Sequence, residues 1–94
     1  MALRVELVSA DRRVWSGEAS IVVARTVDGD VGILPGHAPL LAVLAPGDIK
    51  IEPSTIGESD VFAHADGGFL SVEHDRVTIV ADRAAVGASL AAPC

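Results

Sequence analysis

The sequence predicts an all-β fold, a single β-sandwich or barrel, and three observations support this prediction. Apolar residues alternate with polar ones along most of the 94-residue chain, as in strands with one buried face. These segments recur about every 8–12 residues, the spacing typical of sandwiches and barrels. The nine glycines and five prolines fall almost entirely between the segments, where turns require them. The length suits one domain.

The N-terminal part of the chain predicts two strands. In LRVELVS (residues 3–9) apolar and charged side chains alternate, so one face is expected to be buried. SIVVART (residues 20–26) is rich in β-branched residues, which favour strands. Turn signals at Asp11 and at Ser16–Gly17 lie between the two segments. Trp15, the only tryptophan, is expected to anchor the core or its rim, with an interface contact as the alternative.

The middle of the chain predicts a hairpin turn and two further strands. Asp28–Gly29 is a strong signal for a hairpin turn. LLAVLA (residues 40–45) lies between Pro39 and Pro46 and predicts a short buried strand. GDIKIE (residues 47–52) alternates again and predicts the next strand.

The C-terminal part predicts three more strands and a short tail. DVFAHA (residues 60–65), FLSVEH (residues 69–74) and RVTIVA (residues 76–81) all suit strands. Asp66–Gly67–Gly68 predicts a second hairpin turn. The tail, residues 81–94, is expected to form at most a short helical turn because a glycine and a proline interrupt it.

Composition and charge exclude several kinds of partner. The net charge is −6 and the chain has one lysine, so neither nucleic acid nor an anionic lipid surface is an expected partner. No apolar stretch approaches the ~20 residues that cross a bilayer, so membrane association is expected only through another subunit. The only cysteine, Cys94, cannot form an internal disulfide.

Motifs for catalysis or cofactor binding are absent from the sequence. Lys50 is not part of a phosphate-binding loop, so no nucleotide site is expected. His37, His64 and His74 lack the spacing of metal ligands, although His37, His64 and Asp66 could converge in a fold. We therefore expect no catalytic site, metal or cofactor. A small-ligand or metal-binding β-sandwich or cupin-like enzyme stays open as the alternative, as does an assembly chaperone or adaptor.

The stretch GDVGILPGHAPLLA (residues 29–42) is the most distinctive part of the sequence. Its two prolines fix φ, and each restricts the residue before it to extended conformations. The loop is therefore expected to be stiff, with apolar side chains held on a set shape. Such a loop suits recognition better than acid–base chemistry, which needs paired titratable groups.

Two long motifs resemble the ε subunit of the F-type ATP synthase, called δ in mitochondria. GDVGILPGHAPLLAVLAPGDIKI (residues 29–51) matches every fixed position of the family signature, and GGFLSVEHDRVTIVAD (residues 67–82) matches a second one. The opening LRVELVSADRRVWSGEAS is also similar to the family's start. The resemblance covers residues 3–84. It implies a ten-stranded β-sandwich at residues 1–84 and a short tail at residues 85–94.

The resemblance implies a non-catalytic rotor subunit. Such a subunit binds the γ subunit and the ring of c subunits in the central stalk, and it helps couple proton translocation to ATP synthesis. One copy per complex is expected, monomeric when isolated. It would be a peripheral membrane protein on the cytoplasmic face of the bacterial plasma membrane. The family's two C-terminal helices have no counterpart here, so inhibition of ATP hydrolysis and ATP binding are not expected.

The same resemblance implies two sets of contact residues. The c-ring contacts are Asp28, Gly29, Asp30, Val31, Gly32, His37, Ala38, Pro39 and Leu40. The γ-subunit contacts are Ser9, Ala10, Asp11, Leu41 and Leu44.

Overall fold

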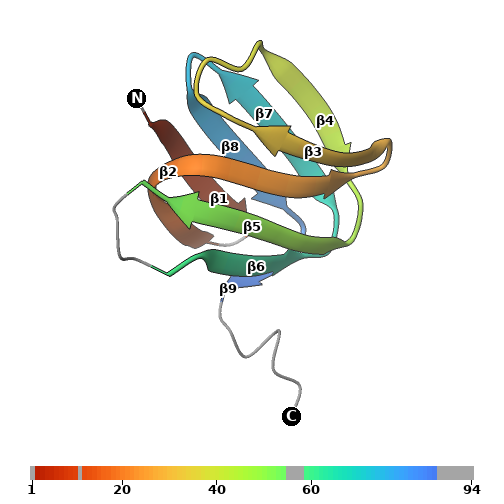
Figure 1. The fold of residues 1–94 in the computed structure, drawn as a ribbon. Helices are drawn as coiled ribbons and strands as arrows, with labels where there is room; N and C mark the ends of the chain where they lie inside the picture. Colours follow the sequence, from red (N-terminus) through yellow and green to blue (C-terminus); the bar gives the residue numbers. More distant parts are fainter. Residues whose placement is uncertain (1, 11, 55–58, 87–94) are drawn as a thin grey trace.

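Nine β-strands make up the computed structural model, which describes residues 2–10, 12–54 and 59–86 (Figure 1). The strands are β1 (Leu3–Ser9), β2 (Arg12–Thr26), β3 (Gly29–Ile33), β4 (Leu40–Leu44), β5 (Gly47–Pro53), β6 (Val61–Ala65), β7 (Gly68–Glu73), β8 (Arg76–Ala81) and β9 (Ala84–Val86). The described residues include no helix, and hence none that could cross a membrane. The all-β prediction is confirmed.

The strands form one hydrogen-bonded sheet that folds back on itself into two facing layers (Figure 1). Its order is β1-β8-β7-β4-β2-β5-β6-β9, and β3 pairs with β2. One layer contains β1, β8, β7 and β4, and the other contains β3, β5, β6 and β9. β2 belongs to both, because its first half pairs with β1 and its second half with β3 and β5.

The length of β2 corrects the expected turn at Ser16–Gly17. β2 continues through both residues for 15 residues in all, because Glu6 pairs with Ser16 and Val5 with Gly17 in a regular ladder to β1. The strand expected at residues 20–26 thus begins at Arg12, and the described residues form nine strands where the resemblance implied ten. Trp15 packs against the core from β2, as expected of a core anchor.

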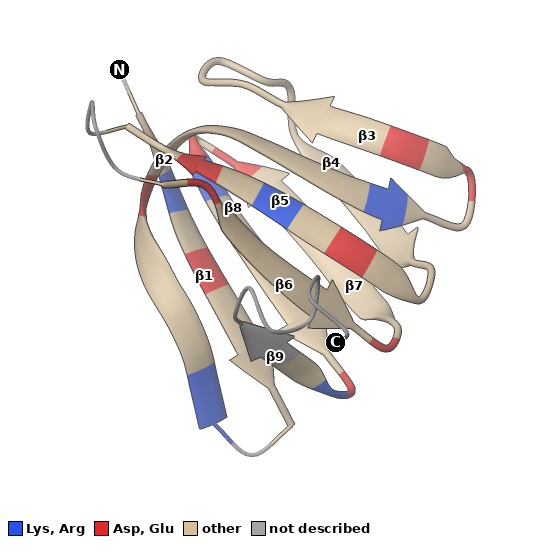
Figure 2. Cartoon of the chain, turned by 60° about the horizontal axis from the view of Figure 1, so that its bottom comes forward, with Lys and Arg blue, Asp and Glu red and all other residues tan. Residues whose placement is uncertain are grey.

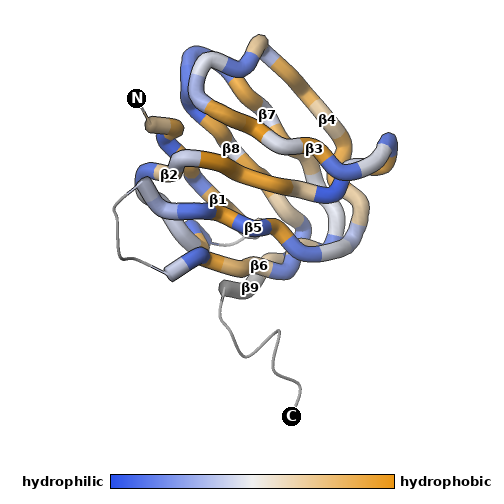
Figure 3. Tube along the Cα trace, viewed as in Figure 1, coloured by the Kyte–Doolittle hydropathy of each residue, from blue (hydrophilic) through white to orange (hydrophobic). Residues whose placement is uncertain are grey.

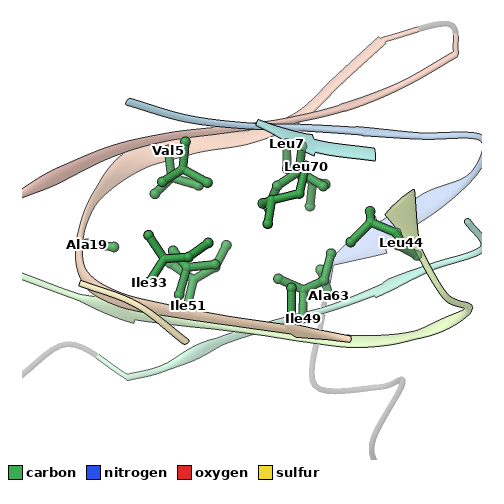
Figure 4. Close-up of a cluster of buried hydrophobic side chains, with 14 of the residues drawn as sticks. Val5, Leu7, Ala19, Ile33, Leu44, Ile49, Ile51, Ala63 and Leu70 are labelled. Carbon is green, nitrogen blue, oxygen red and sulfur yellow. The ribbon is translucent and has the colours of Figure 1, made fainter. Parts of the chain in front are cut away.

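The core between the layers is aliphatic. Val5, Leu7 and Leu70 from one layer face Ile49 and Ile51 from the other (Figure 4). Alternation with a period of two places these side chains inward and their neighbours outward. The hydropathy of successive residues alternates along β5 (Figure 3). Each large aliphatic side chain buried in this way contributes about 1.5–3 kcal/mol to folding.

The connections confirm one predicted hairpin and correct two other expectations. Asp28–Gly29 joins the paired strands β2 and β3. Asp66–Gly67 instead links the two layers, because β6 pairs with β5 and β9 whereas β7 pairs with β4 and β8. Ala84–Val86 forms a strand beside β6, where a helical turn was expected. Residues 87–94 lie outside the described part of the chain.

Candidate docking surfaces

Among the described residues, a side-chain hydrogen bond fastens the loop of residues 34–39 to the rest of the sandwich. The backbone N–H of His37 donates to the carbonyl of Leu34 at 3.1 Å, which closes a tight turn. The N–H of Gly36 donates to Asp75 Oδ1 at 2.7 Å, and Asp75 lies in the turn between β7 and β8. A carboxylate acceptor makes this a charge-assisted hydrogen bond. The loop is therefore fastened to one end of the β7–β8 hairpin.

Replacing Asp75 with glycine should release this loop. Glycine tolerates the φ of 60° that Asp75 adopts, so the variant removes the carboxylate without straining the turn. We expect faster amide exchange at Gly36 and a loss of about 1 kcal/mol of unfolding free energy, since the bond is exposed. His74→Gly is the control, because His74 has a φ of 51° in the same turn. If the amide of Gly36 exchanges at the same rate in both variants, the Asp75 carboxylate does not hold the loop in place.

The β2–β3 turn is organised by the hydroxyl of Thr26. Its Oγ1 donates to the carbonyl of Gly29 at 2.6 Å and accepts from the N–H of Asp28 at 3.1 Å. Asp30, next along β3, makes an exposed ion pair with Arg25 at 3.4 Å. The turn thus presents two exposed carboxylates on a fixed backbone.

The proposed ring contacts fall into two groups that the structure separates. Asp28, Gly29 and Asp30 lie at the start of β3, whereas His37 follows its end. The five residues of β3, which include Gly29 to Gly32, span about 13 Å and lead from the first group toward the second. The side chains of two of the residues, Val31 and Leu40, pack against the core and are only partly exposed. Gly32 and Ala38 are exposed, and Pro39 is also exposed.

The outer side of β4, β7 and β8 carries an apolar face, which we define as Leu41, Val43, Phe69 and Val80. Val43 pairs with Phe69 and Phe69 with Val80, so the three form a row across the strands. Leu41 lies on the same side of β4 and is 75% exposed, and Phe69 is 52% exposed. The whole of β4 is hydrophobic (Figure 3). Exposed apolar side chains that are contiguous in this way mark interaction surfaces.

The expected γ-contact residues differ in their exposure. Leu41 belongs to the apolar face and Ala10 is exposed. Leu44 is only 3% exposed and is part of the core, so its side chain is not available to a partner. Ser9 is buried and its hydroxyl donates to the carbonyl of Arg12 at 3.3 Å. Asp11 lies outside the described residues.

Three residues of the apolar face were missed by the sequence analysis. Val43 was not assigned a contact because LLAVLA (residues 40–45) was expected to be a buried strand, and no contact was expected at Phe69 or Val80. Phe69 and Leu70 are adjacent, so one must point outward when the other points inward. Consecutive apolar residues in a strand with one buried face were the available signal.

The outer side of β5 and β6 is charged. Acidic and basic residues alternate along β5 (Figure 2). Lys50 Nζ forms ion pairs with Glu52 Oε2 at 3.2 Å and with Asp60 Oδ2 at 3.7 Å. The hydrogen bond to Glu52 and the charges of both acids raise the pKa of Lys50 above its ordinary value. His64 lies 3.2 Å from Asp48.

The three histidines, which a metal-binding or cupin-like enzyme would use, lie in different parts of the fold. His64 is on β6 beside Asp48, whereas His37 is in the loop, where its Nδ1 contacts the carbonyl of Ala38 at 2.6 Å. His74 is in the β7–β8 turn. In the described ranges, no three histidine, cysteine or acidic residues are grouped so that they could hold a metal ion.

An aliphatic sandwich with an apolar outer face and a fastened, proline-stiffened loop defines a protein-docking domain. Comparison with known proteins gives the family. The family described as "ATP synthase, Delta/Epsilon chain, beta-sandwich domain" matches residues 2–87, so the chain belongs to the delta/epsilon chains of ATP synthase. As such it is a non-catalytic subunit of the central stalk.

Individual relatives agree. The ATP synthase epsilon chain of Micrococcus luteus is 53% identical over 90 residues, which cover 96% of this chain and 97% of that one. The epsilon chain of Streptomyces griseus is 52% identical over 80 residues, but these span 63% of its length and 85% of this chain. A chain of the Euglena gracilis mitochondrial ATP synthase superposes with a TM-score of 0.82 at 25% identity, over 90% of this chain and 53% of that one.

Proposed function

We propose that this chain binds the γ subunit and the ring of c subunits, and so helps couple proton translocation to ATP synthesis. The observation that carries the proposal is the apolar face, since it offers a partner contiguous exposed hydrophobic side chains. The bacterial epsilon chains among the relatives support this assignment. Within the complex, one monomeric copy would lie peripherally at the cytoplasmic face of the bacterial plasma membrane.

We assign the γ contact to the apolar face, together with Ala10, which follows the adjoining strand β1. The ring contact is assigned to residues 28–32 and 37–40. Because residues 29–32 are in β3 and residues 37–40 follow its end, a ring contact that uses both segments must include this strand. In the described part of the chain β3 pairs only with β2, so its other edge is open to such a contact.

Titration of the chain with purified γ subunit tests the proposal. A ligand that binds only the folded state raises the unfolding temperature, by linkage. We expect an increase with γ that saturates at one γ per chain, measured by scanning calorimetry and isothermal titration. An unchanged unfolding temperature at saturating γ would contradict the proposal.

Replacing Asp30 with arginine should weaken the ring contact and leave the fold intact. Asp30 is exposed and the variant places a second positive charge beside Arg25. Because exposed ion pairs contribute about 0–1 kcal/mol, we expect at most about a fivefold loss of affinity for the ring. This weaker contact should appear as less proton pumping per ATP hydrolysed in reconstituted complexes. The far-UV spectrum checks that the variant is folded.

Asp60→Arg makes the same charge change on an exposed carboxylate before β6 and serves as the control. If complexes with Asp30→Arg and complexes with Asp60→Arg pump the same number of protons per ATP, the assignment of Asp30 to the ring contact is wrong.

A further inference from the structure

A charged row lies beyond the apolar face on the same layer. Cross-strand pairing aligns Glu73 with Arg76, Arg76 with Arg4, and Arg4 with Glu18. All four residues are exposed, and the next residue along each of β1 and β8 is buried, so the row points outward. The two arginines occupy paired positions on parallel strands, about 4.8 Å apart.

Neither arginine of this row is in an ion pair with another described residue. Glu6, on the same outer side, is bonded to Arg13 at 3.1 Å. Asp75, which adjoins Arg76, accepts from the N–H of Gly36 instead. Like charges side by side on neighbouring strands repel each other. Each arginine also lies opposite a glutamate, Glu73 or Glu18, but forms no ion pair with it. The two guanidinium groups are therefore free to bind an anionic group of a partner.

A partner on the apolar face would also reach this row. Arg76 precedes Val80 by four residues on β8, which is about 13 Å along the strand. An interface of ordinary size buries about 800 Å² on each partner, equivalent to a patch about 16 Å in radius. A guanidinium covered by such a patch loses its water, and this is unfavourable unless an anion replaces it.

We infer that Arg4 and Arg76 together bind a carboxylate group of the protein that covers the apolar face; this inference rests on the proposed docking of γ. Guanidinium groups bind carboxylates through two parallel hydrogen bonds, and two neighbouring arginines can enclose one carboxylate. A protein carboxylate fits better than a lipid or nucleic-acid phosphate, because the pair continues an apolar face and the net charge of −6 repels polyanions. With an apolar row at one end and cations at the other, the surface fixes the direction in which the partner lies along the strands.

The test compares γ binding by the full chain with that of Arg4→Gln, Arg76→Gln and the double variant, at several salt concentrations. We expect the double variant to bind γ about tenfold more weakly at low salt and to lose most of the salt dependence of Kd. Arg25→Gln/Lys50→Gln removes the same charge from the opposite layer and should bind like the unmodified chain. Thermal unfolding of each variant checks that it is folded.

Each other outcome has a distinct meaning. If the double variant retains both the affinity and the salt dependence while Phe69→Asp loses binding, the inference is overturned and the docking of γ on the apolar face stands. If Phe69→Asp also binds normally, the proposed docking on this face fails too. If the chain binds vesicles of phosphatidylcholine and phosphatidylglycerol through the two arginines, the anion is a lipid phosphate and the inference is wrong.

Discussion

Replacing Phe69 with aspartate is expected to weaken binding of the γ subunit by at least about 100-fold. Phe69 is at the centre of the row formed with Val43 and Val80, and it is 52% exposed in the free chain. An interface that forms there would bury the new carboxylate without a counter-charge, which costs far more than the lost apolar contact. Since the side chain already faces solvent, the variant should stay folded, with at most about 1 kcal/mol lost from weaker strand propensity.

Phe62→Asp is a matched control for this prediction. Phe62, the other phenylalanine, is 41% exposed on β6, on the outer side of the opposite layer. The same substitution there should leave the affinity for γ within about twofold, a difference that lies inside the ordinary effect of a surface change. Isothermal titration of both variants with γ makes the comparison. If Phe62→Asp loses binding and Phe69→Asp binds normally, γ binds the layer that contains β6, and the assignment to the apolar face is wrong.

The second large effect is expected for Gly68→Ala, on stability. Gly68 begins β7 with a φ of 122°, a conformation that residues with a Cβ rarely adopt. A Cβ there would collide with the carbonyl oxygen of Val80 and come within 2.7 Å of Ala81 Cα, both backbone atoms of the neighbouring strand. Strain and overpacking of this kind each cost about 1–3 kcal/mol, so we expect a loss of about 3–5 kcal/mol.

Such a loss is a large part of the 5–15 kcal/mol typical of a whole domain. Urea unfolding of Gly68→Ala and Gly32→Ala gives the comparison. Gly32 is also in a strand, but a Cβ there would meet nothing within 4 Å. Gly32→Ala should therefore be neutral or slightly stabilising. A loss below about 1 kcal/mol in Gly68→Ala would show that β7 and β8 can separate to admit the methyl group.

The alternation of apolar and polar residues predicts the fold class and most of the strands. It succeeds in β1, where Leu3, Val5 and Leu7 are buried and Arg4 is exposed. It fails at Ser16–Gly17, since residues that favour turns stay in a strand when a neighbouring strand engages their backbone. The order of the strands in the sheet could not be derived from the pattern, because the pairing of β1 with β8 joins segments about 70 residues apart in the sequence.

The candidate site was less predictable than the fold. A uniformly apolar strand such as β4 does not reveal which side faces the core, so Leu41 and Leu44 were grouped although one is exposed and the other is buried. The tertiary structure decides this by pairing β4 with β7. The contact of Asp75 with Gly36 links residues 39 positions apart and leaves no signature in either segment.

The course of β2 through both layers has a mechanical consequence. The apolar face belongs to the layer that contains β1, whereas β3 belongs to the other layer, and β2 is hydrogen-bonded to both strands. If γ pulls on the first layer while the ring resists on the second, the load passes along one continuous main chain. Its ladders to β1, β3 and β5 are then loaded in shear, with many hydrogen bonds sharing the force at once. The sandwich would transmit torque as a stiff coupling, without relying on the side-chain contacts between its two layers.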